Sequence, residues 1–100
     1  MDYQIAEESS QRTIVMQGRL AFNDSHAMRD IIAAIDGAPR RLVFDLSGLD
    51  FLDSAGLGML LLVREEANSK KWPLLFKGAQ GQVRRMLHLT RFDSLAQMED

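Results

Sequence analysis

The spacing of hydrophobic and polar residues changes several times along the chain. Residues 3–7 alternate weakly between apolar and polar, and Thr13–Gln17 is a β-branched run that Gly18 ends. The polar residues 8–12 between them are typical of a turn. This part of the sequence therefore predicts a β-hairpin.

The next segment has helical spacing. Asn23-Asp24-Ser25 offers a choice of N-cap residues, and Gly37 with Pro39 ends the segment. A short buried strand is predicted after it, over Leu42–Leu46. The helix between these limits has one apolar face, formed by residues at i, i+3, i+4 and i+7: Met28, Ile31, Ile32 and Ile35.

The second half of the chain continues this alternation. A second helix is predicted from about Ser54 to Ser69, and a strand over Pro73–Phe76 with Trp72 at its start. A third helix follows Gly81-Gln82, and Leu95–Met98 fits either a short strand or a helical turn. The inward-facing positions of the third helix are predicted to be Val83, Met86, Leu87 and Thr90.

A hairpin followed by alternating helices and strands predicts the α/β class. We expect one domain over residues 1–100, with a mixed, largely parallel β-sheet and packed α-helices. One hundred residues are enough for a single hydrophobic core.

Composition narrows the function classes. A net charge of −2 disfavours nucleic-acid binding, which usually needs a basic surface. The absence of cysteine rules out disulfides, zinc–thiolate sites and thiol nucleophiles. No metal-site spacing is present, and no cofactor is predicted. The apolar run Leu57–Val63 is too short to insert across a membrane, and no signal-peptide pattern is present, so we expect a cytoplasmic protein.

The candidate site is Asp53-Ser54-Ala55-Gly56-Leu57-Gly58, where a strand leads into the second helix. A serine at a helix N-terminus lies beside unpaired backbone N–H groups and the positive end of the helix dipole, which favour a phosphate. Gly56 and Gly58 remove side-chain bulk and would let a partner approach closely. The simpler interpretation is that Asp53 and Ser54 are ordinary capping residues.

The apolar residues of the second helix allow two interpretations of how much of the helix is buried. Met59, Leu60, Val63 and Ala67 share one arc of the helix. Leu57 and Leu61 extend that arc on one side, and Leu62 lies outside it. The helix is either buried between the sheet and a neighbour, or it keeps one of these leucines exposed to anchor a partner.

An enzymatic role for Ser54 is disfavoured. Its surroundings do not match Gly-x-Ser-x-Gly, and a catalytic triad would need His26 or His88 beside it, oriented by a carboxylate. No P-loop is present. Arg84 and Arg85 on the third helix are interpreted as a solvated face, with phosphate or acidic-partner binding as the alternative. The sequence predicts a binding module and not an enzyme.

Three segments together resemble the STAS domain family, and more narrowly the bacterial anti-sigma-factor antagonists. They are Gly18-Arg19-Leu20, the stretch from Asp45 to Gly58, and Gln82-Val83-Arg84-Arg85-Met86-Leu87. The resemblance covers essentially the whole chain. It implies a STAS fold and a partner switch. The unmodified antagonist binds an anti-sigma factor that is also a serine kinase, phosphorylation ends the binding, and a serine phosphatase restores it.

The family motif assigns roles to particular residues of this chain. It implies that Ser54 is the phosphorylated serine and Asp53 its acidic neighbour. We also expect a partner-binding surface formed by Asp53, Gly56, Leu57, Gly58, Leu61 and Asp24, on a protein that is a monomer when free. Many members carry an aspartate where this chain has Ala21, and Asp24 follows three residues later. Other STAS domains are subunits of transport or scaffold complexes, so a STAS subunit that is never phosphorylated is the alternative.

Overall fold

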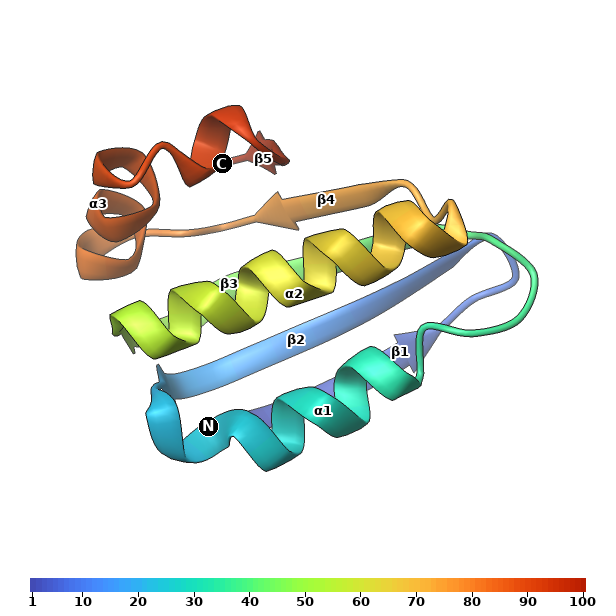
Figure 1. Ribbon diagram of the computed structural model, residues 1–100, viewed down its shortest axis with the longest axis horizontal. Helices are drawn as coiled ribbons and strands as arrows, with labels where there is room; N and C mark the ends of the chain where they lie inside the picture. The colour runs from blue at the N-terminus through green and yellow to red at the C-terminus, as the bar shows by residue number, and fades with distance from the viewer.

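The computed structural model describes all residues from 1 to 100. The elements follow in this order along the chain: β1 (Asp2–Glu7), β2 (Gln11–Leu20), the 3-10 turn η1 (Phe22–Asp24), α1 (Ser25–Ala33), β3 (Arg41–Leu52), α2 (Ser54–Lys70), β4 (Leu74–Lys77), α3 (Gly81–Leu89), the 3-10 turn η2 (Phe92–Ser94) and β5 (Gln97–Glu99). The five strands form one sheet in the order β1-β2-β3-β4-β5. Helices α1 and α2 lie side by side across one face of it (Figure 1).

The predicted sheet type is confirmed. β1 and β2 form the antiparallel hairpin, in which Ile5 pairs with Ile14. The pairs β2–β3, β3–β4 and β4–β5 are all parallel. Because α1 and α2 each connect two parallel strands, both helices run in the same direction along the sheet (Figure 1).

The two central strands are longer than their sequences predict. β2 continues through Gly18, which has a φ of 90°, and ends at Leu20. β3 extends beyond Leu46 to Leu52. The register shifts twice along this pair, at 15–17 and at 18–19 of β2. Such irregularities break the two-residue alternation that identifies a strand in a sequence.

One hydrophobic core lies between the sheet and the helices. α2 buries the four residues predicted for its inner arc, and α1 buries Met28 and Ile31. Val83 and Leu87 of α3 are buried as predicted, and Met86 packs against the core from a partly buried position. Thr90 was predicted to face inward, but it is exposed, and its hydroxyl donates to the carbonyl oxygen of Met86 at 2.7 Å. Thr90 therefore stays at the surface, where its hydroxyl bonds to the last turn of α3.

The ends of three elements differ from prediction by small shifts. One 3-10 turn precedes α1, and Asp24 takes the N-cap position among the three candidates. β4 begins at Leu74, after Pro73, which lacks the N–H that a strand position would use. The segment predicted as a short strand or a helical turn, Leu95–Met98, ends in β5.

Candidate functional site

Ser54 is the first residue of α2 and follows β3 after a one-residue turn. That residue, Asp53, is the N-cap in an extended conformation. Its Oδ1 accepts a hydrogen bond from the backbone N–H of Gly56 at 2.7 Å. The sequence-based interpretation of Asp53 as the helix cap is confirmed, and this leaves the Ser54 side chain free of a capping role.

Asp53 also joins the start of α2 to the end of β2. Its Oδ2 accepts from the backbone N–H of Phe22 at 3.2 Å, and its own N–H donates to the carbonyl oxygen of Leu20 at 3.3 Å. Both carboxylate oxygens are therefore used within the chain. Asp53 positions the site and is less available for a partner than the sequence suggests.

Gln82 fixes the other side of the same turn. Its amide oxygen accepts from the N–H of Leu52 at 2.9 Å, and its amide nitrogen donates to the carbonyl oxygen of Leu52 at 2.8 Å. This two-point bond holds the first turn of α3 to the last residue of β3. This role is not visible in the sequence, because a single glutamine beside a helix start gives no signal of its partner.

Gly56 is buried, which corrects its predicted place on a partner-facing surface. A Cβ at this position would lie 2.4 Å from the carbonyl oxygen of Leu20 and 2.7 Å from a methyl of Leu52. The glycine therefore allows a close approach inside the molecule, between α2 and the ends of β2 and β3. The helical projection contains a signal for this, because Gly56 shares an arc with Leu60 and Val63.

Gly58 has the opposite environment. A Cβ there would have no atom within 4 Å. Ser54, Gly58 and Leu62 follow one another at intervals of four residues and form an outward stripe on α2. Leu62 is 58% exposed. Leu57 and Leu61 are half-buried and pack against the core, so each keeps only part of its side chain available to a partner.

The hydroxyl of Ser54 is exposed and makes no hydrogen bond within the chain. The backbone N–H groups of Ser54 and Ala55 likewise have no acceptor in the chain. They lie at the positive end of a 17-residue helix. A phosphate on this hydroxyl would find unpaired donors and a favourable dipole beside it.

Phe22 contributes an exposed aromatic ring beside this site. It is 74% exposed, although its backbone N–H is bonded to Asp53. Phe22 has no signal in the sequence, because it lies between a strand and a helix, outside any apolar pattern. An exposed phenyl ring next to a polar turn is a candidate anchor for a partner.

Asp24 does not have the free carboxylate expected of a docking residue. Its Oδ2 accepts from the N–H of Ala21 at 2.9 Å, and its Oδ1 lies 3.0 Å from the amino group of Met1. The side chain is only 12% exposed. Burial opposes its ionisation, but the Ala21 N–H and the amino group outweigh burial and lower the pKa of Asp24. Its carboxylate closes the turn that contains Ala21, so the geometry assigns Asp24 a structural role.

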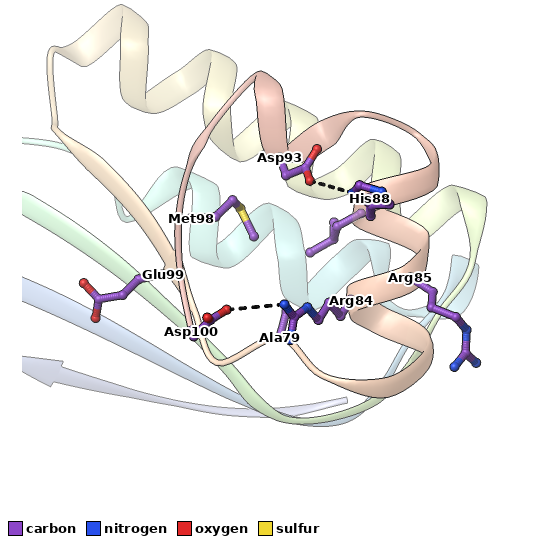
Figure 2. Close-up of a pocket in the computed structure, with 9 residues that line it drawn as sticks. Ala79, Arg84, Arg85, His88, Asp93, Met98, Glu99 and Asp100 are labelled. Atoms are coloured by element: carbon purple, nitrogen blue, oxygen red, sulfur yellow. Dashed lines mark hydrogen bonds and ion pairs between the residues drawn. The ribbon is translucent and has the colours of Figure 1, made fainter.

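A hollow of about 390 Å³ lies between α3 and the C-terminal segment (Figure 2). His88 lies 3.1 Å from Asp93, and Arg84 lies 3.9 Å from Asp100. Arg85 points away from the other residues drawn (Figure 2). The carboxylates of Asp93 and Asp100 lie beside His88 and Arg84 and would repel a phosphate. The interpretation of Arg84 and Arg85 as solvated surface residues therefore fits better than phosphate binding.

Three further features bear on chemistry. Neither histidine is hydrogen-bonded to Ser54, and His88 is paired with Asp93 at 3.1 Å. No group of three or more histidine or carboxylate side chains is arranged to hold a metal ion. None of the helices combines the length and the apolar character needed to cross a membrane.

Two curated bacterial proteins are similar to this chain. A STAS-domain containing protein of Pseudomonas aeruginosa is 34% identical over 88 residues, which are 88% of this chain and 87% of that protein. A Bordetella bronchiseptica protein named "Putative anti-sigma factor antagonist BtrV" is 32% identical over 66 residues, which are 66% of this chain and 57% of that protein.

Solved structures share the fold. An anti-sigma factor antagonist from Mycobacterium paratuberculosis has a TM-score of 0.85 at 23% identity, over 98% of this chain and 84% of that one. The Bacillus cell fate determinant SpoIIAA in its phosphorylated form has a TM-score of 0.74 at 18% identity, over 99% of this chain and 91% of that one. A sulfate transporter family protein from Wolinella succinogenes has a TM-score of 0.81 at 14% identity, over 95% of this chain and 80% of that one.

The family assignment rests on the whole chain and on the fold together. The family model described as "Mlab, STAS domain" matches residues 3–97. The five-stranded mixed sheet with three helices is the fold of the anti-sigma factor antagonists of known structure. The protein belongs to the STAS domain family.

Proposed function

We propose that this protein is an anti-sigma-factor antagonist controlled by reversible phosphorylation of Ser54. The observation that carries the proposal is that the Ser54 hydroxyl is exposed at the start of α2 with no bond of its own, while Asp53 supplies the cap. The named relatives and the resemblance of residues 45–58 to the family motif support the partner class. In this proposal the protein is a binding module and not an enzyme.

The partner is an anti-sigma factor that is also a serine kinase. It binds the stripe formed by Ser54, Gly58 and Leu62, with Phe22 and the exposed parts of Leu57 and Leu61 at its border. The kinase transfers the γ-phosphoryl group of ATP to the Ser54 oxygen, and ADP and the hydroxyl proton leave. A serine phosphatase later hydrolyses the ester with water, which restores the free hydroxyl.

The added phosphate acts locally. It contributes nearly two negative charges at neutral pH, within a surface that the partner must desolvate. Asp50 and Asp53 precede it in the chain and add to the negative charge. The helix N-terminus accommodates the phosphate without unfolding, because the N–H groups of Ser54 and Ala55 are unpaired. The partner is therefore repelled while this protein keeps its fold.

Ser25 provides a matched internal control for the site assignment. Like Ser54, it is exposed, begins a helix and follows an aspartate. Four residues later, however, α1 carries Arg29 where α2 carries Gly58. Incubation with the cognate kinase and ATP, followed by mass-spectrometric mapping, should place the phosphate on Ser54 alone. Phosphate on Ser25, Ser47 or Ser94 in its place would refute the assignment.

The second candidate is a STAS subunit of a transport or scaffold complex that is never phosphorylated. The fold similarity to a sulfate transporter family protein favours it. Intact-mass measurement of the protein isolated from its native cells separates the two functions. The switch proposal requires a fraction heavier by one phosphate, whereas the subunit function requires a single unmodified mass and copurification with a transport or scaffold complex.

A further inference from the structure

A shallow groove of about 490 Å³ lies between α1 and α2, the two helices that run side by side in Figure 1. Its lining residues are Arg29, Ile32, Leu62, Glu65, Glu66 and Ser69. Its two apolar residues are Ile32, which is half-buried, and Leu62, which is 58% exposed. The charged residues border this apolar pair, which is the arrangement of an apolar centre within a polar rim that protein interfaces have.

The two rims carry opposite charges. The α1 rim carries Arg29, and the α2 rim carries Glu65 and Glu66. Arg29 and Glu66 take part in no ion pair within the chain, and Glu65 pairs only with its exposed neighbour Arg64 at 3.1 Å. The basic rim of one such groove therefore complements the acidic rim of another.

We propose that a second copy of this chain occupies the groove, related to the first by a two-fold axis that runs along it. This axis places α1 of each copy over α2 of the other. Arg29 of each copy then faces Glu65 and Glu66 of the other, so the same contact forms twice. An axis across the groove would instead place Arg29 on Arg29. The charges thus select one of the two symmetric arrangements.

The same arrangement buries the apolar pair. Leu62 of each copy covers Ile32 of the other. The contact is small, so the dimer is weak. It forms without phosphorylation and without an anti-sigma factor, but it covers Leu62, so the second copy and the proposed partner compete for that side chain.

A charge exchange between two variants tests the arrangement. Arg29→Glu should not self-associate, because glutamate would face Glu65 and Glu66. Glu65→Arg/Glu66→Arg should not self-associate either, because arginine would face Arg29. A mixture of the two should associate again, since both rim contacts then join opposite charges. The measurement is sedimentation velocity from about 10 µM to about 1 mM, after Trp72 fluorescence has shown that each variant is folded.

Each outcome decides the proposal. Dimers of the wild type and of the mixture, with both variants monomeric alone, support it, and Leu62→Asp should then lower self-association at least tenfold. A wild type that is monomeric throughout, variants that still dimerise, or a mixture that stays monomeric would each overturn it. If the wild type stays monomeric while Leu62→Asp weakens binding of the anti-sigma factor, the groove belongs to that partner instead.

Discussion

The α-carbon of Gly56 lies so close to Leu20 that a Cβ would be 2.4 Å from the Leu20 carbonyl oxygen. Two residues later, a Cβ added to Gly58 would have no atom within 4 Å. Successive positions two residues apart lie on opposite sides of a helix, so one glycine faces the sheet and the other faces outward. The two glycines of the motif thus have separate roles.

Substituting each glycine with alanine should separate these roles. Gly56→Ala should lower the free energy of unfolding by about 2–3 kcal/mol, because backbone atoms of β2 must move to admit the methyl group. Gly58→Ala should be neutral, or should raise that free energy by up to about 1 kcal/mol, because alanine favours the helix. Urea denaturation followed by the fluorescence of Trp72 measures both. Equal midpoints for the two variants would contradict this assignment.

A bulky residue at position 58 should affect the partner and not the fold. Gly58→Leu adds a side chain to the stripe that contains Ser54 and Leu62, and its Cβ would meet no atom within 4 Å. We expect at least tenfold weaker binding of the anti-sigma factor and a melting temperature no lower than that of the wild type, because leucine also favours the helix over glycine. Calorimetric titration beside thermal melts checks this. Unchanged affinity would remove Gly58 from the binding surface.

Replacing Asp53 should test its role as the helix cap. Asp53→Ala leaves the N–H groups of Gly56 and Phe22 without their acceptor, and we expect a loss of about 1–2 kcal/mol in unfolding free energy. Asp53→Asn keeps an oxygen for the Gly56 bond and should lose less. Urea denaturation of the two variants gives the comparison. An asparagine variant as unstable as the alanine variant would show that charge and not capping is what Asp53 provides.

The stability of the protein should fall in acid partly through Glu7. The hydrogen bond from Arg12, at 2.6 Å, lowers the pKa of Glu7 against the opposing effect of desolvation, and Arg40 at 2.7 Å lowers it further. Both guanidinium groups lie against the ring of Trp72. A carboxylate with a lowered folded-state pKa stabilises the fold above its unfolded-state pKa. That stabilisation is lost as the pH falls through the folded-state value.

Denaturation from pH 7 to pH 2.5 should therefore show a smaller acid loss in Glu7→Gln than in the wild type, with the difference developing below about pH 4.3. Glu8→Gln is the matched control, because Glu8 is exposed and makes no ion pair. If Glu7→Gln and Glu8→Gln follow the wild-type curve equally, Glu7 is not coupled to folding.

The parts of the fold whose buried residues recur at a regular spacing can be predicted from the sequence. The apolar arc of α2 and the hairpin are visible because their buried residues recur at helical or strand spacing. The second half of β3 was missed because its buried residues, Leu46, Leu49 and Leu52, are three apart where the register shifts. A bulge depends on the neighbouring strand, so the chain's own period does not reveal it.

The candidate site was predicted in part. Asp53 as the cap and Ser54 as the first helical residue follow from local rules of helix capping. The bond between Gln82 and Leu52 joins residues 30 positions apart in the chain, so local rules do not predict it. The burial of Gly56 does have a local signal, because Gly56 shares a helical arc with Leu60 and Val63, but its lack of a side chain also fits a partner-facing surface, and that interpretation was wrong.

The central claim is that phosphate on Ser54 blocks a partner-binding surface without unfolding the domain. Calorimetric titration of the anti-sigma factor, with unmodified and Ser54-phosphorylated protein, tests it most directly. Burying an uncompensated charge costs several kcal/mol, so we predict that phosphorylation weakens binding more than about a hundredfold, with amide NMR shifts confined to the start of α2 and η1. Equal affinity of the two forms would contradict the switch, and shifts spread across the sheet would contradict its local mechanism.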